Sequence, residues 1–196
     1  KLTTKWVGGE GVQHLQNDLL CGQGELESTK PTLTLMKLAK KYDENESYRS
    51  FFKSTKMEDL YIKIQELDDS TIYDDILNYL DLYGFRCNDE QKLEENDLHD
   101  DPSFVLNSIQ KYIKNKNYNI EDMMKREHLI RSKAESRIKN ELSGLKFIVY
   151  NWVLKHARNA VKNRENLRFL RSKCFGISRK LFRSMGLKFS QLGIIK

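Results

Sequence analysis

The chain has 196 residues, 39% of them hydrophobic and 32% charged, and a formal net charge of +6. This length suits one large domain or two small ones, and the composition excludes a disordered chain. No apolar run approaches the roughly 20 residues of a membrane-spanning helix. The three cysteines are far apart and outside any CxxC pattern, so we expect reduced thiols in a cytoplasmic protein, without a zinc site.

Apolar residues recur at helical spacing through the N-terminal half. The pattern predicts a succession of helices, with Ser, Thr or Pro near their starts and Gly at several ends. The first predicted helix covers residues 10–21 and ends at Gly22 and Gly24, and the second begins after Ser28 or Thr29. The next two cover residues 46–54 and 56–67, and the last of this group extends from Ser70 or Thr71 to Gly84. The following residues, 85–101, are polar and acidic and lack a helical period, so we expect the longest loop there.

The C-terminal half predicts longer helices. Residues 101–115 begin with Asp-Pro, which is typical of an N-cap followed by proline in the first turn of a helix. From residue 120 to residue 174 the chain has no proline and only one glycine, Gly144. We therefore predict two long helices, over 120–142 and 145–174, or one helix that is kinked near Gly144.

Gly176 is expected to end the second long helix, and residues 177–189 to form a last amphipathic helix. Since no strand pattern competes, the predicted fold class is all-α, a multi-helix bundle with two long C-terminal helices. We expect a single helical domain over 1–196, with an acidic part at 1–119 and a basic part at 120–196. The charge balance supports these parts, because it is −7 up to residue 120 and +13 beyond it.

The sequence contains no complete catalytic or metal-binding motif. None of the four histidines stands at ligand spacing from another His or Cys, and no carboxylate pair stands out as a general acid and base. The glycine-rich VGGEG at 7–11 lacks the Lys-Ser/Thr that a phosphate loop needs, and it predicts a turn. We therefore expect a helical scaffold without a catalytic residue, a metal or a cofactor of its own.

The stretch HARNAVKNRENLRFLRSKCFG at 156–176 concentrates Lys and Arg around a single acid, Glu165. Steps of three and four place Glu165 beside Arg158, Lys162 and Arg168 on one helical face, where opposite charges attract. One interpretation is an ion-paired strut within a larger enzyme. The alternatives are a helical nucleic-acid-binding domain and a non-enzymatic interaction domain. A nucleic-acid groove more often lacks a central acid and carries exposed aromatic residues for stacking, which disfavours the first alternative.

Three stretches occur in the order NDLLCGQGELESTKPT, YGFRCNDEQKLEENDLHDDPSFVL and HARNAVKNRENLRFLRSKCFGISRKLF. Together they resemble the phosphoenolpyruvate (PEP) synthase family, the pyruvate, water dikinase-like phosphotransferases, whose relatives include the rifampicin phosphotransferases. The resemblance covers about residues 10–192, and it rests on the order of the three motifs because their residue types are ordinary.

The resemblance implies a place for this chain in a larger enzyme. Enzymes of the family join an ATP-grasp domain to a swivelling domain with a phosphorylated histidine, and this chain is similar to the helical region between them. We therefore expect an excised piece of a longer polypeptide, in which those two domains bind ATP and Mg and pass phosphate to a small-molecule acceptor. The piece by itself is expected to be inactive, and neither a membrane nor nucleic acid is an expected partner.

The resemblance also implies a set of substrate-binding residues, because in rifampicin phosphotransferases this region forms the acceptor pocket. The family pattern Tyr-Gly-x-Arg-Cys-x-x-Glu falls on residues 83–90, Lys92 matches the synthase-like branch, and a later Arg-Glu pattern falls on Arg164 and Glu165. Asp89 and Gln91 depart from that branch, which leaves the acceptor open and argues mildly against rifampicin itself. The expected substrate-binding residues are Arg86, Glu90, Lys92, Arg164, Glu165 and Arg168. We expect the loop at 85–101 to fold back near the last three and to form one wall of an acceptor cleft.

Overall fold

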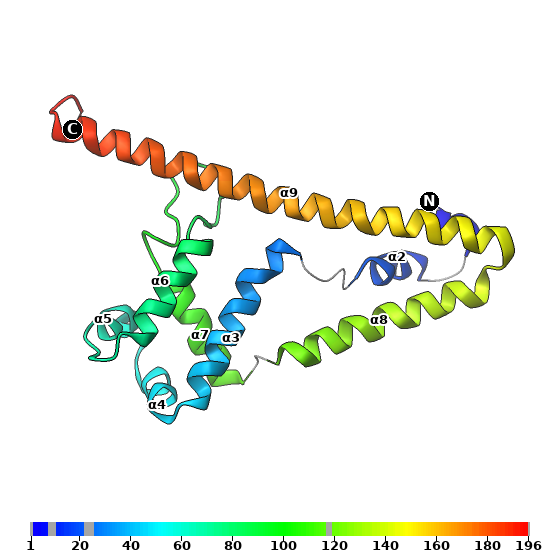
Figure 1. Cartoon of the computed structure of the whole chain (residues 1–196), viewed down its shortest axis with the longest axis horizontal. Coiled ribbons are helices and arrows are strands. Elements are labelled where there is room, and N and C mark those ends of the chain that lie inside the picture. The colour runs from blue at the N-terminus through cyan, green and yellow to red at the C-terminus, as the bar shows by residue number, and fades with distance from the viewer. Residues whose placement is uncertain (1, 8–10, 22–25, 117–118, 196) are drawn as a thin grey trace. The chain divides into compact units, whose positions relative to one another are not determined.

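The computed structural model describes residues 2–7, 11–21, 26–116 and 119–195 (Figure 1). Within these ranges the regular elements are helices and there is no strand, which confirms the predicted all-α fold class. Most of the glycine-rich stretch at 7–11, and the predicted helix end at Gly22 and Gly24, lie outside the described residues. No helix in the described part of the chain combines the length and apolarity needed to cross a membrane.

The chain divides into two compact units. The first contains residues 1–28 and 119–167, and the second contains residues 29–118 and 168–196. Each unit thus combines a segment of the acidic part with a segment of the basic part, so the units do not follow the division by charge. Whether the two units act as one domain stays a prediction.

The first unit packs helix α2 (Val12–Leu20) against helix α8 (Ile120–Glu141). Its remaining helical parts are α1 (Leu2–Trp6) and the N-terminal half of α9 (Gly144–Gln191). The small core of this unit consists of Leu15, Leu19, Ala134, Ile138, Leu142 and Tyr150. These residues recur at steps of three or four within each helix, so one apolar stripe per helix faces this core.

The two long C-terminal helices are separate, which is the first of the two predicted alternatives. The Asn119 side chain caps the start of α8 by accepting a hydrogen bond from the Asp122 backbone N–H. Gly144 begins α9 with a φ of 54°, a left-handed conformation that glycine adopts without strain. The chain therefore breaks between α8 and α9 and does not form one kinked helix.

In its described residues the second unit contains five further α-helices, the short 3₁₀ helix Met57–Asp59 and the C-terminal half of α9. The five are α3 (Lys30–Glu44), α4 (Glu46–Ser54), α5 (Leu60–Gln65), α6 (Thr71–Tyr83) and α7 (Ser103–Asn115). Their core is larger and includes Tyr42, Phe52, Leu60, Ile76, Leu106 and Ile109. A buried Gln110 donates hydrogen bonds to the carbonyls of Phe52 and Thr55, so it ties α7 to the end of α4. The polar stretch 85–101 is irregular, which confirms the predicted loop.

The prediction that Gly176 ends a helix is wrong, because α9 continues through this residue to Gln191. Residues 177–189 are therefore not a separate helix. Gly176 is needed for a close approach, since a Cβ atom there would lie 2.4 Å from the Cβ of Phe85. Glycine lowers helix stability by only about 1 kcal/mol relative to alanine, so one glycine in a long helix without proline does not stop it.

We expect Gly176→Ala to lower the free energy of unfolding by about 1–2 kcal/mol. The added methyl group would overlap Phe85, and the cost of this overlap should exceed the free energy gained from the higher helix propensity of alanine. Gly186→Ala is the matched control in the same helix, where a Cβ would meet no atom within 4 Å. The control should be neutral or should stabilise the chain by up to about 1 kcal/mol. Urea unfolding of both variants measures the difference, and equal effects would contradict the close packing at Gly176.

Candidate functional site

The loop at 85–101 lies against the C-terminal half of α9 within the second unit. Phe85, at the start of the loop, is buried, and its ring meets the edge of the Phe169 ring with 5.4 Å between centroids. Phe85 also packs on Gly176, which stands about two turns after Phe169 in α9 and leaves room for it because glycine has no Cβ. This contact brings a segment without regular structure onto a rigid helix, which is a common arrangement for binding residues.

Arg179 holds this loop in place from a fully buried position. Its Nη1 donates to the Phe85 carbonyl at 3.3 Å, and its Nη2 donates to the Lys92 carbonyl at 2.8 Å and to the Cys87 Sγ at 3.1 Å. The buried carboxylate of Asp97 lies 3.8 Å from Nη1 and balances the charge. A guanidinium can satisfy several acceptors at once, so this single side chain pairs with loop groups that are up to 12 residues apart.

A second arginine on the same helical face extends this attachment. Arg183 donates to the Glu95 carbonyl at 2.8 Å and pairs with the Asp100 carboxylate. Burial is the largest single influence on the pKa of Asp100 and acts to raise it, but the hydrogen bond and charge of Arg183 and the backbone N–H of Asp97 together lower this pKa. Arg179 and Arg183 therefore attach both the middle and the end of the loop to α9.

Of the predicted substrate-binding residues, the structure brings Arg86 and Glu90 together. The Arg86 Nε lies 2.8 Å from the Glu90 Oε1, and the Ser172 hydroxyl of α9 donates to the other carboxylate oxygen of Glu90. The Arg86 guanidinium also lies over the Phe169 ring, 5.9 Å from its centroid. Glu90 is thus held between the loop and α9, and the Arg86 side chain remains 37% exposed.

The other predicted residues occupy different surroundings. The Lys92 side chain is half exposed and pairs with Asp89 at 2.6 Å, while its backbone carbonyl accepts from Arg179. Arg164 and Glu165 form an ion pair at 3.0 Å in the first unit. Arg168 is exposed in the second unit, and its backbone carbonyl accepts a hydrogen bond from Ser172. A single cleft formed by all six residues stays a prediction.

A pocket of about 500 Å³ opens beside the loop in the second unit. Its walls come from α3, α6, the loop and α7, and they include Pro31, Leu35, Tyr79, Arg86, Cys87, Asp97, Phe104, Ser108 and Tyr112. The lining combines aromatic rings with one partly exposed arginine and with the carboxylates of Glu95, Asp97 and Asp101, so it suits an amphipathic small molecule that carries hydrogen-bonding groups.

The titratable groups of this pocket are suited to binding and not to nucleophilic attack. Burial raises the pKa of the Tyr79 hydroxyl to about 12 and also raises the pKa of the Cys87 thiol. Both groups are therefore protonated at neutral pH, and a protonated thiol is a poor nucleophile. The pocket can hold a molecule and orient it, but its own side chains supply no activated nucleophile.

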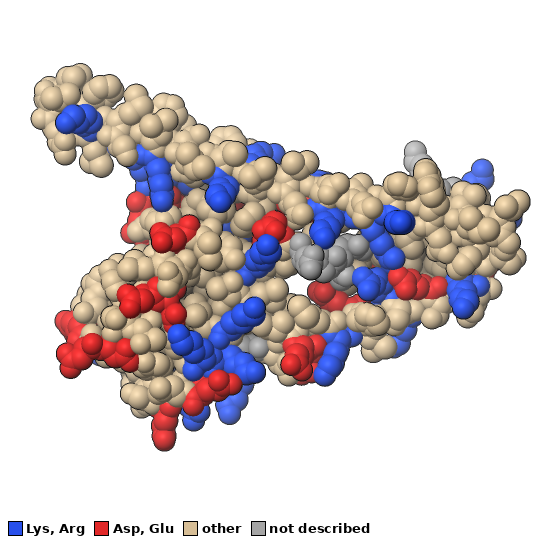
Figure 2. Space-filling model, in the orientation of Figure 1, with Lys and Arg blue, Asp and Glu red and all other residues tan. Residues whose placement is uncertain are grey.

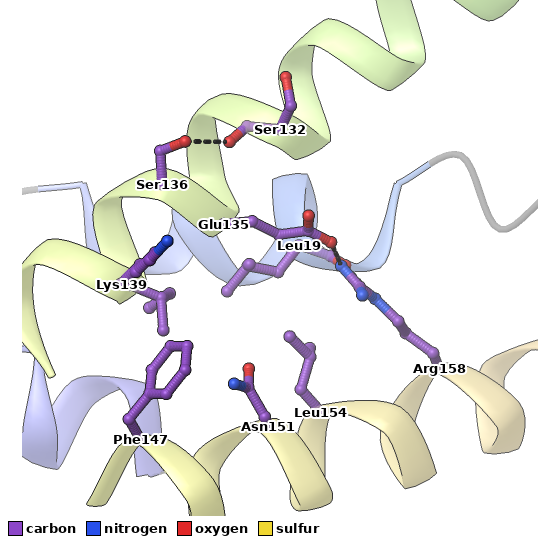
Figure 3. Close-up of a pocket in the computed structure, with 10 residues that line it drawn as sticks. Leu19, Ser132, Glu135, Ser136, Lys139, Phe147, Asn151, Leu154 and Arg158 are labelled. Carbon is purple, nitrogen blue, oxygen red and sulfur yellow. Dashed lines mark hydrogen bonds and ion pairs between the residues drawn. The ribbon is translucent and has the colours of Figure 1, made fainter. Parts of the chain in front are cut away.

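A second pocket, of about 480 Å³, lies in the first unit between α2, α8 and the N-terminal half of α9. Figure 3 shows Phe147, Asn151 and Leu154 pointing from α9 toward α8. Arg158 borders the pocket, donating to the Leu19 carbonyl at 2.8 Å and to the Glu135 carboxylate at 2.7 Å. Sequence reasoning missed this role of Arg158, since its partners stand 139 and 23 residues away along the chain.

Sequence reasoning also missed Arg179 and Ser172. Both stand on the helical face that carries Gly176 and Arg183, at steps of three and four, and that spacing is the only signal that could have found them. It does not distinguish a buried arginine from the many exposed cations of the same helix. Across the described residues, no group of three or more His, Cys, Asp and Glu side chains could hold a metal ion.

Comparison with protein families found one match to most of the chain. A family model for the rifampicin phosphotransferase fourth domain matches residues 1–165. The matched range contains the loop, its pocket and the Arg158 contacts, while Ser172, Arg179 and Arg183 lie beyond it. Comparisons with curated proteins and with solved structures found no match.

We expect Arg179→Met to lower the free energy of unfolding by about 3–5 kcal/mol, because it leaves Asp97 buried without its cation. Arg171→Met, in the exposed part of the same helix, is the matched control and should change stability by less than about 0.5 kcal/mol. Urea unfolding measures both, and amide hydrogen exchange should quicken across 85–101 only in the first variant. Unchanged exchange there would mean that Arg179 does not hold the loop.

Proposed function

This chain belongs to the family of the rifampicin phosphotransferase fourth domain, and from that membership we propose that it is the acceptor-binding and linking helical domain of an ATP-dependent phosphotransferase. The membership makes it a phosphotransferase-related domain. The finer role is supported by the pocket beside the loop at 85–101. This pocket combines room for a small molecule with two residues of the acceptor-pocket pattern, Arg86 and Cys87.

In this proposal the chemistry takes place on other domains of the same polypeptide. The partners are an ATP-grasp domain and a swivelling phosphohistidine domain of the PEP-synthase-like kind, and ATP and Mg bind there. The free thiols of Cys21, Cys87 and Cys174 support a cytoplasmic parent protein.

The contribution of this chain is then to hold the acceptor and to neutralise the charge of the incoming phosphoryl group. Arg86 is well suited to this, because Glu90 orients its guanidinium while part of the side chain stays accessible. The planar fork of an arginine binds phosphate oxygens in a bidentate manner. Arg164, whose side chain is 69% exposed, is proposed as a second cation that faces phosphohistidine or phosphate.

Filling the pocket tests the proposal in the intact parent enzyme. Ser108 of α7 lines the pocket, so Ser108→Trp should occupy much of it and raise the KM for the acceptor at least about tenfold, which corresponds to about 1.4 kcal/mol of binding. The KM for ATP should not change, because the nucleotide binds elsewhere. Steady-state kinetics with each substrate varied in turn measures both constants.

Lys114→Trp is the matched control, since Lys114 is exposed on the same helix and does not line the pocket. It should leave both constants unchanged. Equal acceptor KM values for the two variants would refute the assignment of the pocket to the acceptor. A rise of both KM values in Ser108→Trp would instead indicate a general loss of structure, which the melting temperature of that variant would reveal.

The isolated chain should neither hydrolyse ATP nor take up label from radioactive ATP or PEP. The reason is that its sequence contains neither a phosphate loop nor a histidine in the glycine-rich context of a phosphate shuttle. Acid-quenched and base-quenched labelling, followed by gel autoradiography, is the measurement. Base-stable label on any of the four histidines would contradict the assignment of the chemistry to other domains.

A further inference from the structure

The C-terminal half of α9 carries an apolar stripe on the face opposite the loop at 85–101. The stripe, here termed the outer seam, consists of Leu170, Cys174, Ile177, Leu181 and Met185. Leu170, Ile177 and Leu181 are 55%, 61% and 59% exposed. Their spacing of four and three residues keeps them on one narrow face, as in the contact seam of a coiled coil.

The opposite face of the same helix segment is fully engaged. Ser172, Gly176, Arg179 and Arg183 contact the loop, at positions about half a turn away from the seam. These contacts fix the rotation of α9 about its axis relative to the loop. The seam is therefore a preformed surface, and a partner that binds it does not bear the cost of ordering this helix.

The borders of the outer seam are strongly basic. Residues 166–196 contain no Asp or Glu at all, and Arg171, Lys173, Lys180 and Lys188 are exposed on α9 next to or within the stripe. Lys180 also contacts the His99 ring at 3.2 Å. Figure 2 shows blue Lys and Arg side chains spaced along this part of α9, with uncharged residues in tan between them.

We propose that the outer seam binds an acidic amphipathic helix of a partner protein. The apolar side chains of the partner would cover Leu170, Ile177 and Leu181, and its Glu or Asp side chains would pair with the bordering cations. The seam from residue 170 to residue 185 extends about 22 Å, which is enough for about two heptads of a partner helix. This proposal is independent of the acceptor pocket, because no residue of α9 lines that pocket.

Charge decides among the possible occupants. A second copy of this chain would place one all-basic border against another, and like charges across such a seam are unfavourable. A helix with acidic borders satisfies both the apolar and the charged parts of the surface.

A synthetic three-heptad peptide with Leu at the seam positions and Glu at the bordering positions is the probe. Fluorescence anisotropy of the labelled peptide should show saturable binding to the 196-residue chain that weakens as salt rises. Leu170→Asn with Ile177→Asn should weaken binding at least about tenfold. The matched control is Leu187→Asn, which removes a leucine that is 67% exposed on the same helix outside the seam.

Reversal of charge separates specific docking from general adhesion. Arg171→Glu with Lys173→Glu should lose the Glu-bordered peptide and gain a peptide with Lys in its place. Both double variants change exposed side chains, so their thermal unfolding should match that of the unchanged chain.

Four results would overturn the proposal. The first is failure of the acidic peptide to bind, and the second is an equal loss of peptide affinity in the seam variant and the Leu187 variant. The third is equal affinity for the Glu-bordered and Lys-bordered peptides. The fourth is seam-dependent binding to vesicles of phosphatidylcholine and phosphatidylserine that is tighter than binding to the peptide. Sedimentation of the chain alone adds a further check, since a dimer that the seam variants dissociate would assign the seam to a second copy. None of these results bears on the acceptor pocket, so the two proposals can fail separately.

Discussion

The attachment of the loop at 85–101 to α9 depends on the buried guanidinium of Arg179. A loop without regular structure has backbone carbonyls that no helix or strand satisfies, and burying them without partners is costly. Arg179 supplies donors to three of these carbonyls, those of Phe85, Glu90 and Lys92, and to the Cys87 sulfur, and Asp97 balances its charge. The same contacts place Arg86, Cys87 and Asp97 along one wall of the pocket in the second unit.

Continuity of α9 is the second condition for this arrangement. Gly176 lets Phe85 approach the helix backbone, and the helix still continues for 15 residues beyond it. If α9 ended at residue 176, Arg179 and Arg183 would not stand on the face that carries Ser172. One helix therefore presents two different surfaces: an inner one that orders the loop, and an outer apolar seam with basic borders.

The chemistry available in the pocket agrees with a role in holding a substrate. Raised pKa values keep the Tyr79 hydroxyl and the Cys87 thiol protonated, so both can donate a hydrogen bond to a ligand at neutral pH. Arg86 supplies a positive charge that Glu90 keeps in one orientation. In a phosphotransferase of several domains, a site of this kind can orient an acceptor while the reactive phosphoryl group arrives from another domain.

Most of the helices and the loop at 85–101 could be predicted from the sequence, and the break at Gly144 was one of two predicted alternatives, because periodicity, capping residues and glycine act over a few residues. The short helix α1 was not predicted. The continuation of α9 through Gly176 could not, because the role of that glycine depends on Phe85, 91 positions earlier in the chain. Arg86 and Glu90 were recognisable from a local motif. The Ser172 partner of Glu90 and the buried position of Arg179 arise from contacts between residues 82 to 94 positions apart. Local patterns thus determined where this chain is helical, and only long-range packing decided which of its many arginines are buried and which remain available to a ligand.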